Sequence, residues 1–529
     1  MTTYFVSPTG KDTNAGTSAA QSLATIQAAA DRTKPGDVVE VMSGIYSRPT
    51  SGGYVVDITK SGTASAPIVF EAAPGQHPVI DSSNQWAGIE VDGSSFITVQ
   101  GFEVTGDAAN ISASYAQSQA NNTNNPTTAG NGIEIAPPYG GGANPTHVTI
   151  QNNVVHDQPG AGIDTLGADY VSILNNTVYD DAWWSPYGNS GISVFKSASS
   201  DSNTGYKTVI AGNTVYGNRE YVAWKAAGKI TDGNGIIVDS NNQSGYNGRT
   251  LVENNVTYNN GGTGAHAFDS DHVDFFYNTA YQNNQSPGLQ EGQIVGQRSS
   301  DVRIENNILE AAPGGQVNDA GATYDYNVFY GGNVLASGPH DIVADPLFAS
   351  PGSGDFALQA GSPAIGSATA AFAAAGQQVG ASASDLANRG AFRGVTSGAS
   401  SGQSGGSGDS GPVNSAADTL VLNVSADVWK GAPQFLVSID GAEQTGTFST
   451  SARHGAHQSQ AFTFTGNFGS GGHDVAVTFL NDAWGGTPST DRNLYVDSID
   501  YDGVAYPSAS GALYSDGTMH FTIPAAANG

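Results

Sequence analysis

The chain has 529 residues and a formal net charge of −29, because 47 Asp and Glu outnumber 18 Lys and Arg. Such a charge opposes binding to nucleic acid and to anionic membranes, and the length requires several domains or a repeat architecture. The absence of cysteine excludes disulfides and thiolate metal sites, and no run of 18 apolar residues could cross a membrane. The 70 glycines favour a β-rich chain with many turns.

The first predicted element is an N-terminal helix. Residues 23–37, LATIQAAADRTKPGD, have an amphipathic pattern that ends at Pro35-Gly36. We expect this helix to cover the open end of a repeat structure, since an uncovered sheet end would pair with other chains.

Self-similar segments follow, and they align on asparagine. Their shortest spacings are 20 and 23 residues, and the aligned asparagines are Asn153, Asn176, Asn213, Asn255, Asn278, Asn307 and Asn327. A unit of this size cannot bury its apolar face alone, whereas stacked units can. The sequence therefore predicts an all-β fold, a right-handed parallel β-helix, with an internal asparagine ladder. A second, aromatic ladder is expected three residues after each asparagine.

A further strand that begins with glycine lies between these segments. The residue two after each glycine should face outward, which gives the column Glu134, Asp164, Ser193, Ile237, His266 and Ile294. Glu134 and Asp164 should lie about 5 Å apart, as an acid/base pair or a chelating pair. His266 is a candidate base with Asp239 beside it, although it could also be a surface residue bonded to a neighbouring coil.

The segment DDAWWSPYGNS, residues 180–190, should project as a loop beside this column. Tryptophan and tyrosine rings stack on sugars, so Trp183, Trp184 and Tyr187 are candidate substrate contacts, although one tryptophan is expected to cover the edge of a coil. Asp180 and Asp181 are sugar ligands, metal ligands or turn residues. We expect loop 107–131 to wall the groove and loop 196–206 to present Lys196.

The composition changes after residue 394. Residues 395–416 form a Gly/Ser-rich segment that predicts a flexible linker. Residues 417–529 alternate like strands and predict a small antiparallel β-sandwich. The predicted domains are therefore 1–394, a β-helix with a helical cap, and 417–529.

The opening segment, YFVSPTGKDTNAGTSAAQSLATIQAAADRTKPGDVVEVMSGIY, resembles the N-terminal cap of family nine polysaccharide lyases of the pectate-lyase superfamily, and residues 344–366 resemble their closing segment. The resemblance implies elimination at a uronate, with calcium neutralising the carboxylate and a lysine removing a proton. That lysine follows a Gly-Asn-Gly-aromatic pattern. Here the matching text is GNGIIVD and the position holds Ile237, so Lys196 or His266 would have to act instead.

Residues 417–529 resemble calcium-dependent xylan-binding modules of carbohydrate-binding families thirty-six and sixty. The segments that carry this resemblance are NVSADVW, VSIDG and VTFLNDAWGGTPSTDRNLYVDSIDYDG. The match implies that Asp482 and Asp491 hold Ca²⁺, which then binds sugar hydroxyls, and that Trp484 stacks on a sugar. Hard oxygen ligands on a loop suit this ion.

We therefore predict an extracellular polysaccharide-cleaving enzyme, although the first residues show no signal peptide. A lyase is the first hypothesis. A glycoside hydrolase is the alternative, favoured by Ile237 and by the carboxylates of Glu134, Asp164 and Asp239. A third possibility is a sugar-binding surface protein without catalysis. We expect calcium in the binding module, with a groove site as an alternative, a polysaccharide partner and a monomeric chain.

Overall fold

The computed structural model describes residues 1–369, 385–391, 395–396, 418–439, 442–444, 448–450, 452–454, 459–466, 473–484, 491–501, 504–506, 510–515 and 517–523. The chain divides into two compact units, Met1–Ser401 and Gly402–Gly529. Each unit is described by itself. Within the described residues, no helix is long and apolar enough to cross a membrane.

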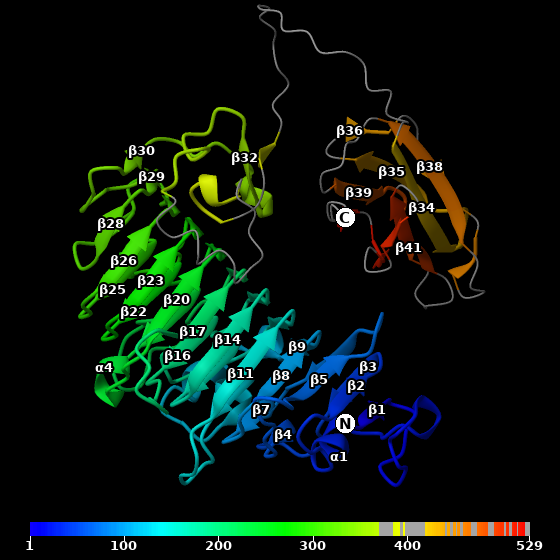
Figure 1. Cartoon of the computed structure of the whole chain (residues 1–529), viewed down its shortest axis with the longest axis horizontal. Coiled ribbons are helices and arrows are strands. Elements are labelled where there is room, and N and C mark those ends of the chain that lie inside the picture. The colour runs from blue at the N-terminus through cyan, green and yellow to red at the C-terminus, as the bar shows by residue number, and fades with distance from the viewer. Residues whose placement is uncertain are drawn as a thin grey trace, which may run out of the picture. The chain divides into compact units, whose positions relative to one another are not determined.

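The first unit is a parallel β-helix, with three sheets that run along its axis (Figure 1). The first sheet contains β1 (Thr3–Val6), β2 (Val38–Val41), β5 (Ile68–Ala72), β8 (Ile97–Gln100), β11 (Thr146–Gln151), β14 (Asp169–Leu174), β17 (Tyr206–Ala211), β20 (Arg249–Glu253), β23 (Val273–Phe276), β26 (Val302–Glu305) and β28 (Thr323–Asp325).

The second sheet contains β3 (Gly44–Ser47), β6 (Pro78–Asp81), β9 (Glu103–Thr105), β12 (Val154–His156), β15 (Thr177–Tyr179), β18 (Thr214–Tyr216), β21 (Val256–Tyr258), β24 (Thr279–Tyr281), β27 (Ile308–Glu310), β29 (Val328–Tyr330) and β30 (Ile342–Val343). The third sheet contains β4 (Tyr54–Ile58), β7 (Ala87–Asp92), β10 (Asn131–Ala136), β13 (Ile163–Leu166), β16 (Ile192–Phe195), β19 (Ile236–Asp239), β22 (Ala265–Phe268) and β25 (Ile294–Gln297). These third-sheet strands include the glycine-initiated strands predicted from the sequence.

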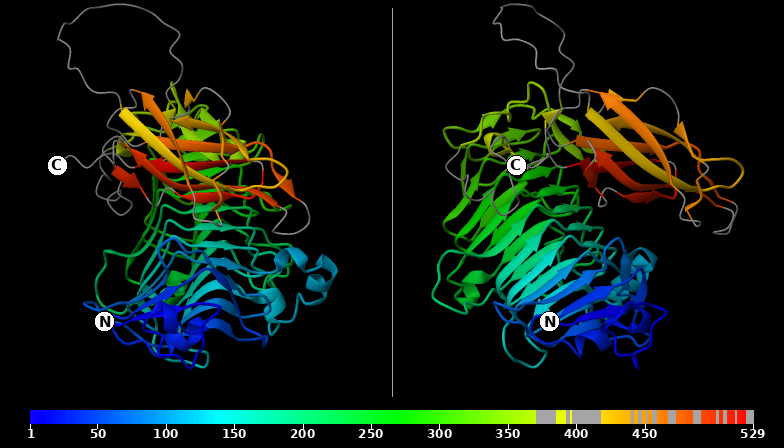
Figure 2. Two further views of the ribbon diagram at one scale, coloured as in Figure 1. Left: turned by 90° about the vertical axis from the view of Figure 1, so that its right-hand side faces the viewer. Right: turned by 45° about the vertical axis from the view of Figure 1, so that its right-hand side comes forward.

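The core lies inside the coils, because each strand alternates its side chains between the interior and the outer face. In the third sheet the inward positions include Ile133, Ile163, Ile192, Ile236 and Ile294, all fully buried in one apolar cluster. The ordered stack of parallel strands is visible in two further views (Figure 2).

The asparagine ladder forms as predicted. Each rung's amide group accepts a hydrogen bond from the backbone of the rung before it, for example 2.9 Å from Asn176 N to Asn213 Oδ1 and 2.9 Å from Asn213 N to Asn255 Oδ1. The series continues through Asn307 to Asn327. The aromatic ladder is also confirmed, with centroid spacings of 4.8 Å for His156–Tyr179 and 4.9 Å for Tyr179–Tyr216.

The N-terminal cap contains the expected helix, but it is short. Helix α1 spans Ile26–Ala30, and the side chain of Thr25 caps it by accepting from Ala28 N. Ile26 and Ala29 pack into the main core and cover the first coil. The remaining described helices of this unit lie in loops and are α2 (Ala113–Ser118), α3 (Pro126–Ala129) and α4 (Asn241–Ser244), with the 3-10 turns η1 (Ala19–Gln21), η2 (Ala108–Asn110), η3 (Pro351–Ser353) and η6 (Asp385–Ala387).

A small sheet follows the last coil. It contains β31 (Phe348–Ser350), β32 (Asp355–Gln359) and β33 (Val395–Thr396), and β33 pairs in parallel with β32. Residues 395–396 therefore belong to the first unit, which corrects the predicted start of the linker. The rest of the predicted linker, 397–416, lies outside the described residues.

The second unit contains two antiparallel sheets, as predicted. The first is built on β34 (Asp418–Asp427), β38 (Gln460–Gly466), β40 (Ala483–Trp484), β41 (Asp491–Tyr501), β42 (Val504–Tyr506) and β43 (Gly511–Leu513). The second is built on β35 (Gln434–Ile439), β36 (Ala442–Glu443), β37 (Phe448–Ser449), β39 (His473–Phe479) and β44 (Gly517–Ile523). Leu420, Val437, Val477 and Leu494 belong to a core cluster that joins the two sheets.

Candidate functional site

One outward row of the third sheet collects most of the predicted catalytic residues. Parallel register places them in the order Asp57, Glu90, Glu134, Asp164, Ser193, Ile237, His266 and Val295. We call this set the outer row. Its members alternate with core residues along each strand, so they point away from the interior, as the sequence predicted. Val295 replaces the predicted Ile294, because Ile294 pairs with Ala265 and points into the core.

The N-terminal end of the outer row is acidic. Glu134 and Asp164 are register partners on neighbouring strands, as predicted, and Glu90 and Asp57 extend the row by two further carboxylates. Burial raises the pKa of Asp164 above its ordinary value, and the charge of Glu134 raises it further. Burial likewise raises the pKa of Glu134, against a 3.2 Å hydrogen bond donated by Asn131 Nδ2. This end of the row can hold protons at neutral pH.

The other end of the row is centred on His266. Its ring is 6% exposed and packs edge-on against Phe268 at 5.7 Å. Nδ1 lies 4.0 Å from Oε2 of Glu291, while Nε2 is buried and has no hydrogen-bond partner among the described residues. Burial lowers the pKa of His266 to about 4, so the imidazole is neutral at ordinary pH and can accept a proton.

Glu291 faces His266, and two further carboxylates lie nearby, since Asp232 acts on the charge of Glu291 and Asp239 is the register partner of Phe268. Glu291 lies on the loop between β24 and β25, Asp232 on the loop between β18 and β19, and Asp239 at the end of β19. Burial raises the pKa of Glu291 to about 7, with Asp232 and Asp319 adding to the rise and Lys229 opposing it. Burial also raises the pKa values of Asp232 and Asp239. The segment DGNG predicts a turn at Asp232, and no sequence pattern points to Glu291, so neither is among the predicted site residues.

The acidic end and the His266 end of the outer row are separate places. Two strands, β16 and β19, lie between Asp164 and His266 in the sheet order. At about 4.8 Å per strand, the two residues are about 14 Å apart. The outer row therefore offers two separate candidate sites, one at Glu134 and Asp164 and one at His266.

Lys196 immediately follows β16, which is an interior strand of the third sheet. Its backbone has φ 50°, and its Nζ lies 4.9 Å from the ring of Phe195. Phe195 is the register partner of Asp239, and the charge of Lys196 lowers the pKa of Asp239 against the effect of burial. The structure therefore places Lys196 beside Asp239. The strand that precedes Lys196, β16, is two positions from the strand of His266, β22, in the sheet order.

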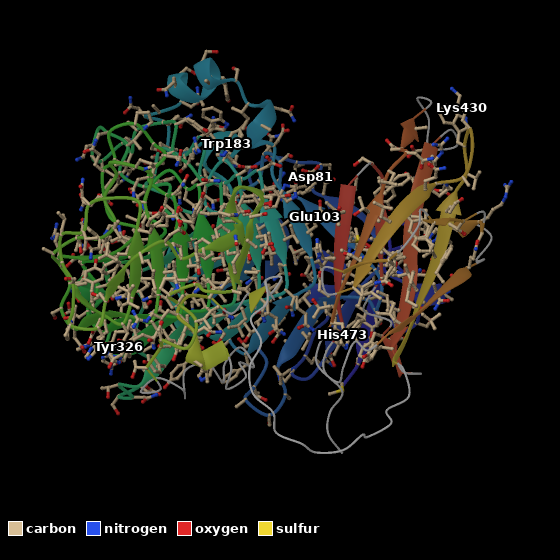
Figure 3. The ribbon with its side chains drawn as sticks, turned by 90° about the horizontal axis from the view of Figure 1, so that it is seen from above. Asp81, Glu103, Trp183, Tyr326, Lys430 and His473 are labelled. Carbon is tan, nitrogen blue, oxygen red and sulfur yellow. The ribbon has the colours of Figure 1, made fainter. Side chains whose placement is uncertain are left out.

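The two adjacent tryptophans have different environments. Trp184 is 7% exposed, packs with Ala108, Ala116 and Val222, and donates a 2.8 Å hydrogen bond from Nε1 to Ala108 O. This corrects its assignment as a substrate contact, since it joins two loops. Trp183 is partly exposed and meets the ring of Trp184 edge-on at 6.0 Å. Figure 3 shows Trp183 beside the short helices of loop 106–130.

The remaining residues of this loop also divide into exposed and buried groups. Tyr187 is 43% exposed, and its hydroxyl donates to Thr123 O at 3.0 Å. Asp180 is partly buried beside the aromatic ladder, where the charge of Arg219 lowers its pKa against the effect of burial. It therefore lies at the corner between the second and third sheets.

Asp181 is fully buried and belongs to a second internal ladder. Its Oδ1 accepts from Gln158 N at 2.8 Å, and its own N–H donates to Asn218 Oδ1 at 3.0 Å. The ladder continues through Asn260, Asn283 and Gln293. This location corrects the assignment of Asp181 as a sugar contact.

The predicted calcium residues of the second unit flank one hairpin. Asp491 begins β41 and pairs with Trp484 of β40, and Asp482 immediately precedes β40. Asn493 is 5% exposed, and its Oδ1 has no hydrogen-bond partner among the described residues. Two carboxylates and a buried amide oxygen near one hairpin fit a hard cation. The side chain of Trp484 and residues 485–490 lie outside what the structure describes.

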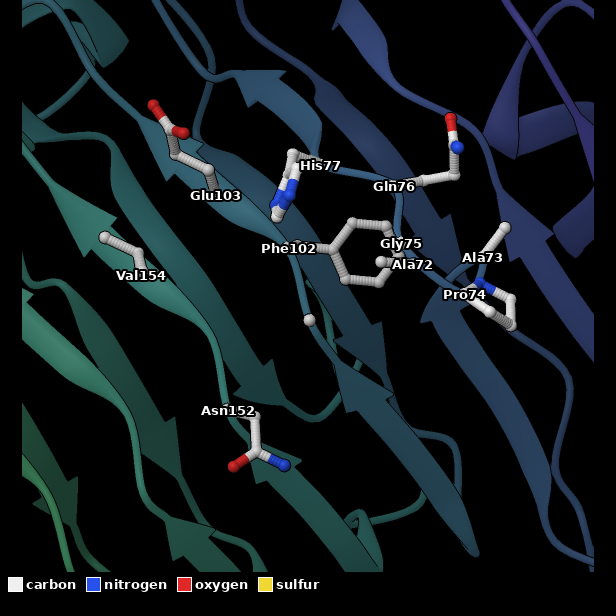
Figure 4. Close-up of a pocket in the computed structure, with 11 residues that line it drawn as sticks. Ala72, Ala73, Pro74, Gly75, Gln76, His77, Phe102, Glu103, Asn152 and Val154 are labelled. Carbon is white, nitrogen blue, oxygen red and sulfur yellow. The ribbon is translucent and has the colours of Figure 1, made fainter. Parts of the chain in front are cut away.

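Two other features bear on ligand binding. A pocket of about 400 Å³ lies at the corner between the first and second sheets, lined by Phe102, Glu103, His77 and Asn152 (Figure 4). It is on a different side of the coil from the outer row. Within the described residues, no group of three or more His, Asp or Glu side chains is arranged to hold a metal ion, so the third-sheet face offers no such cluster for the groove calcium.

Comparison with known families gives two matches. Residues 4–299 match the family model described as "Pel9A-like, right handed beta helix region", and residues 419–515 match "Ca-dependent carbohydrate-binding module xylan-binding". Over 77 residues the chain is 46% identical to pectate lyase PEL9 of Emericella nidulans. That match covers 15% of this chain and 18% of that relative.

Solved structures with a similar chain path include three carbohydrate-active proteins. Pectate lyase Pel9A gives a TM-score of 0.47 at 17% identity, covering 70% of this chain and 92% of its own. A rhamnogalacturonan lyase gives a TM-score of 0.39 at 17% identity, and the match covers 66% of this chain and 91% of that protein. The lacto-N-biosidase of Eubacterium ramulus gives a TM-score of 0.39 at 14% identity, and the match covers 65% of this chain and 67% of that protein.

Proposed function

Because the chain belongs to the family of Pel9A-like right-handed β-helix proteins, we propose that it is a polysaccharide lyase that works on the outer face of the third sheet. The observation that carries this proposal is His266. It is a neutral, nearly buried imidazole whose Nε2 has no hydrogen-bond partner among the described residues and whose other nitrogen faces Glu291.

His266 acts as the base of a β-elimination. Its Nε2 takes the C5 proton of a uronate, the C5–H electron pair becomes the C4–C5 double bond, and the C4–O4 bond breaks. The leaving O4 then takes up a proton. Burial keeps His266 neutral above about pH 4, so it can accept this proton over the ordinary pH range. Lys196, which follows the interior strand β16 of the same sheet, supplies positive charge for the substrate carboxylate.

Glu291 is a positioning residue in this scheme. An ionised carboxylate at 4.0 Å favours the proton on Nδ1, which leaves the lone pair on Nε2. At 4.0 Å this is a charge contact rather than a hydrogen bond, so Glu291 biases the tautomer of His266 without fixing the ring.

Hydrolysis of a glycosidic bond is the second candidate, and the acidic end of the outer row favours it. Glu134 and Asp164 are register partners, so their strands lie about 4.8 Å apart. Retaining glycosidases use two carboxyl groups about 5–5.5 Å apart. Asp164, whose pKa is raised by burial, would donate the proton and Glu134 would act as the nucleophile.

One assay with two readouts separates the candidates. Polysaccharides with and without uronates are incubated with the full chain, and unsaturated uronate absorbance and new reducing ends are followed together. A lyase gives both signals, and a hydrolase gives reducing ends alone. Retention on a polysaccharide without either signal would instead support a sugar-binding surface protein.

We propose that the second unit tethers the enzyme to xylan through calcium. Asp482 and Asp491 would hold the ion with the Asn493 oxygen, and Trp484 would stack on a sugar. Bound calcium supplies direct contacts to sugar hydroxyls, and tethering raises the local substrate concentration. Asp482→Ala is expected to abolish retention on insoluble xylan without changing cleavage of a soluble oligosaccharide. Loss of both properties would contradict this separation of roles.

The proposed setting is extracellular, because the substrate is a polysaccharide too large to enter a cell. The chain acts as a monomer, and its net charge of −29 opposes association between copies. Sedimentation at several protein concentrations tests this, since a mass that rises with concentration would contradict it.

A further inference from the structure

Two exposed aromatic rings lie on the loop between β18 and β19. Tyr221 is 44% exposed and Trp224 is 37% exposed. The Tyr221 ring lies 5.7 Å from that of Trp183 and 5.5 Å from that of Trp184. Tyr221 N donates to Trp183 O at 3.0 Å, and Gln117 Nε2 donates to Tyr221 O at 2.7 Å. Three loops therefore hold this aromatic surface in place.

Trp224 is fixed at the base of a tight turn. Its N–H donates to Lys229 O at 3.0 Å, and Gly228 N donates back to Trp224 O at 2.8 Å. Lys225 N also donates to Pro186 O at 2.9 Å, which ties the turn to the neighbouring loop. Because the backbone on both sides of Trp224 is held, less conformational entropy is lost when a ligand stacks on its exposed indole.

A carboxylate lies close to the same ring, on the far side of Gly188. A Cβ atom on Gly188 would collide with Asp232 Oδ2 and would lie 3.5 Å from Trp224 Cδ2. The absence of a side chain at residue 188 thus lets the indole and the carboxylate converge. Asp232 accepts hydrogen bonds from Thr231 Oγ1 at 2.7 Å and Asn234 Nδ2 at 3.2 Å, so its position is fixed.

The charges near this point determine which sugar could bind. The negative charge of Asp232 adds to the effect of burial in raising the pKa values of Glu220 and Glu291. Lys229 offsets only part of this charge. A uronate carboxylate in direct contact with ionised Asp232 would be repelled, whereas a neutral pyranose can stack its C–H face on the Trp224 indole and donate a hydroxyl to Asp232.

We propose that Trp224 and Asp232 form a subsite for a neutral sugar, next to the His266 end of the outer row. This rests on the proposed function in one respect, namely that a polysaccharide lies along this face. The subsite then indicates which class of polysaccharide the protein binds. The polysaccharide carries neutral sugars close to the uronate that is cleaved, so it is a heteropolysaccharide rather than a chain of uronates alone.

The test measures binding rather than cleavage. Xylohexaose, cellohexaose, galactohexaose and hexagalacturonate are titrated calorimetrically into the full chain in excess EDTA, which removes calcium-dependent binding by the second unit. We expect at least one neutral hexasaccharide to bind, and hexagalacturonate to bind at least tenfold more weakly. Trp224→Ala should weaken neutral binding about tenfold, and Trp224→Phe should retain most of it.

Two further variants control for indirect effects. Gly188→Ala, which places a methyl group between ring and carboxylate, should also weaken binding about tenfold while leaving Trp224 present. Tyr139→Ala removes a fully exposed aromatic ring from the loop after β10 and should bind like the parent. Unchanged affinity in Trp224→Ala, tighter binding of hexagalacturonate than of every neutral sugar, or no neutral binding at all would overturn the proposal. Cleavage of a neutral hexasaccharide would contradict the lyase but not the subsite.

Discussion

Nδ1 of His266 lies 4.0 Å from Oε2 of Glu291, across the gap between the third sheet and the loop that follows β24. The two residues are 25 positions apart in the sequence and one coil apart in the solenoid. The repeat determines the position of His266, whereas a loop determines the position of Glu291. The first two predictions rest on this pair.

The pH dependence of cleavage should follow the neutral form of His266. Its pKa is lowered to about 4, so the free base is present above that pH and is lost as pH falls through it. We expect kcat/KM to fall by about tenfold per pH unit below pH 4 and to be insensitive to His266 titration between pH 5 and 6. A pH–rate profile on a soluble oligosaccharide measures this. An inflection near pH 6.5 that persists in Glu291→Gln, as expected for an unperturbed histidine, would contradict the assignment.

Glu291→Gln should lower kcat by about tenfold with little change in KM, because the amide no longer favours the proton on Nδ1. The carboxyl of Glu291 has a pKa raised to about 7, so its ionised form increases through that pH. The parent should therefore show a second rise in kcat near pH 7 that the variant lacks. A variant that keeps the rise would show that another group causes it. Glu310→Gln, at the end of β27 with a similar raised pKa, is the matched control and should keep the parent profile.

The acidic end of the outer row provides the opposite test. Asp164→Asn removes a carboxyl about 14 Å from His266, so a lyase centred on His266 should keep more than a third of its kcat. A hydrolase that uses Glu134 and Asp164 would lose activity by a factor of about 1000 or more. Initial rates of the parent and of Asp164→Asn on the same substrate, with folding checked by thermal unfolding, distinguish the two centres.

Asp181→Asn should stabilise the protein at neutral pH. Burial raises the pKa of Asp181 well above its ordinary value, so the folded state keeps a proton that the unfolded chain releases. The stability of the parent is therefore complete below about pH 4 and decreases as pH rises above the unfolded pKa. An asparagine matches the neighbouring rung Asn218 and carries no such penalty.

We expect the free energy of unfolding of Asp181→Asn to exceed that of the parent by about 1–2 kcal/mol at pH 7, and the difference to vanish near pH 4. Denaturant titrations at both pH values measure this. Glu40→Gln, on the outer face of β2, removes one negative charge from the same unit and is the control for a general charge effect, with a free energy of unfolding expected within about 0.5 kcal/mol of the parent. If Asp181→Asn differed from the parent by the same free energy of unfolding at pH 4 and at pH 7, the account of the ladder would be contradicted.

The repeat made much of the fold predictable, because each coil places the same residue type at the same corner. Asn153 to Asn327 form one ladder for this reason, and Glu134 and Asp164 were paired by the same argument. The second ladder was missed, although its rungs follow the first by five residues. Gln158, Asp181 and Asn218 differ in type, and Asp181 was interpreted as part of a surface loop.

The candidate site was less predictable, because loops of different length supply half of it. Glu291, Asp232 and Trp224 lie on excursions whose positions no repeat determines, and they came to light only through their contacts. Trp184 was misassigned because the sequence does not show that Ala108 and Val222 cover it. Ile294 was misplaced because the preceding loop shifts the register by one residue.

The central claim is that His266 removes a proton from a uronate on the outer face of the third sheet. The most direct measurement is the initial rate of unsaturated uronate formation by the parent and by His266→Ala on the same acidic heteropolysaccharide. We predict that the parent forms this product and that the variant forms it at least 100-fold more slowly while retaining the parent's melting temperature. Equal rates, or reducing ends from the parent without the unsaturated product, would contradict the account.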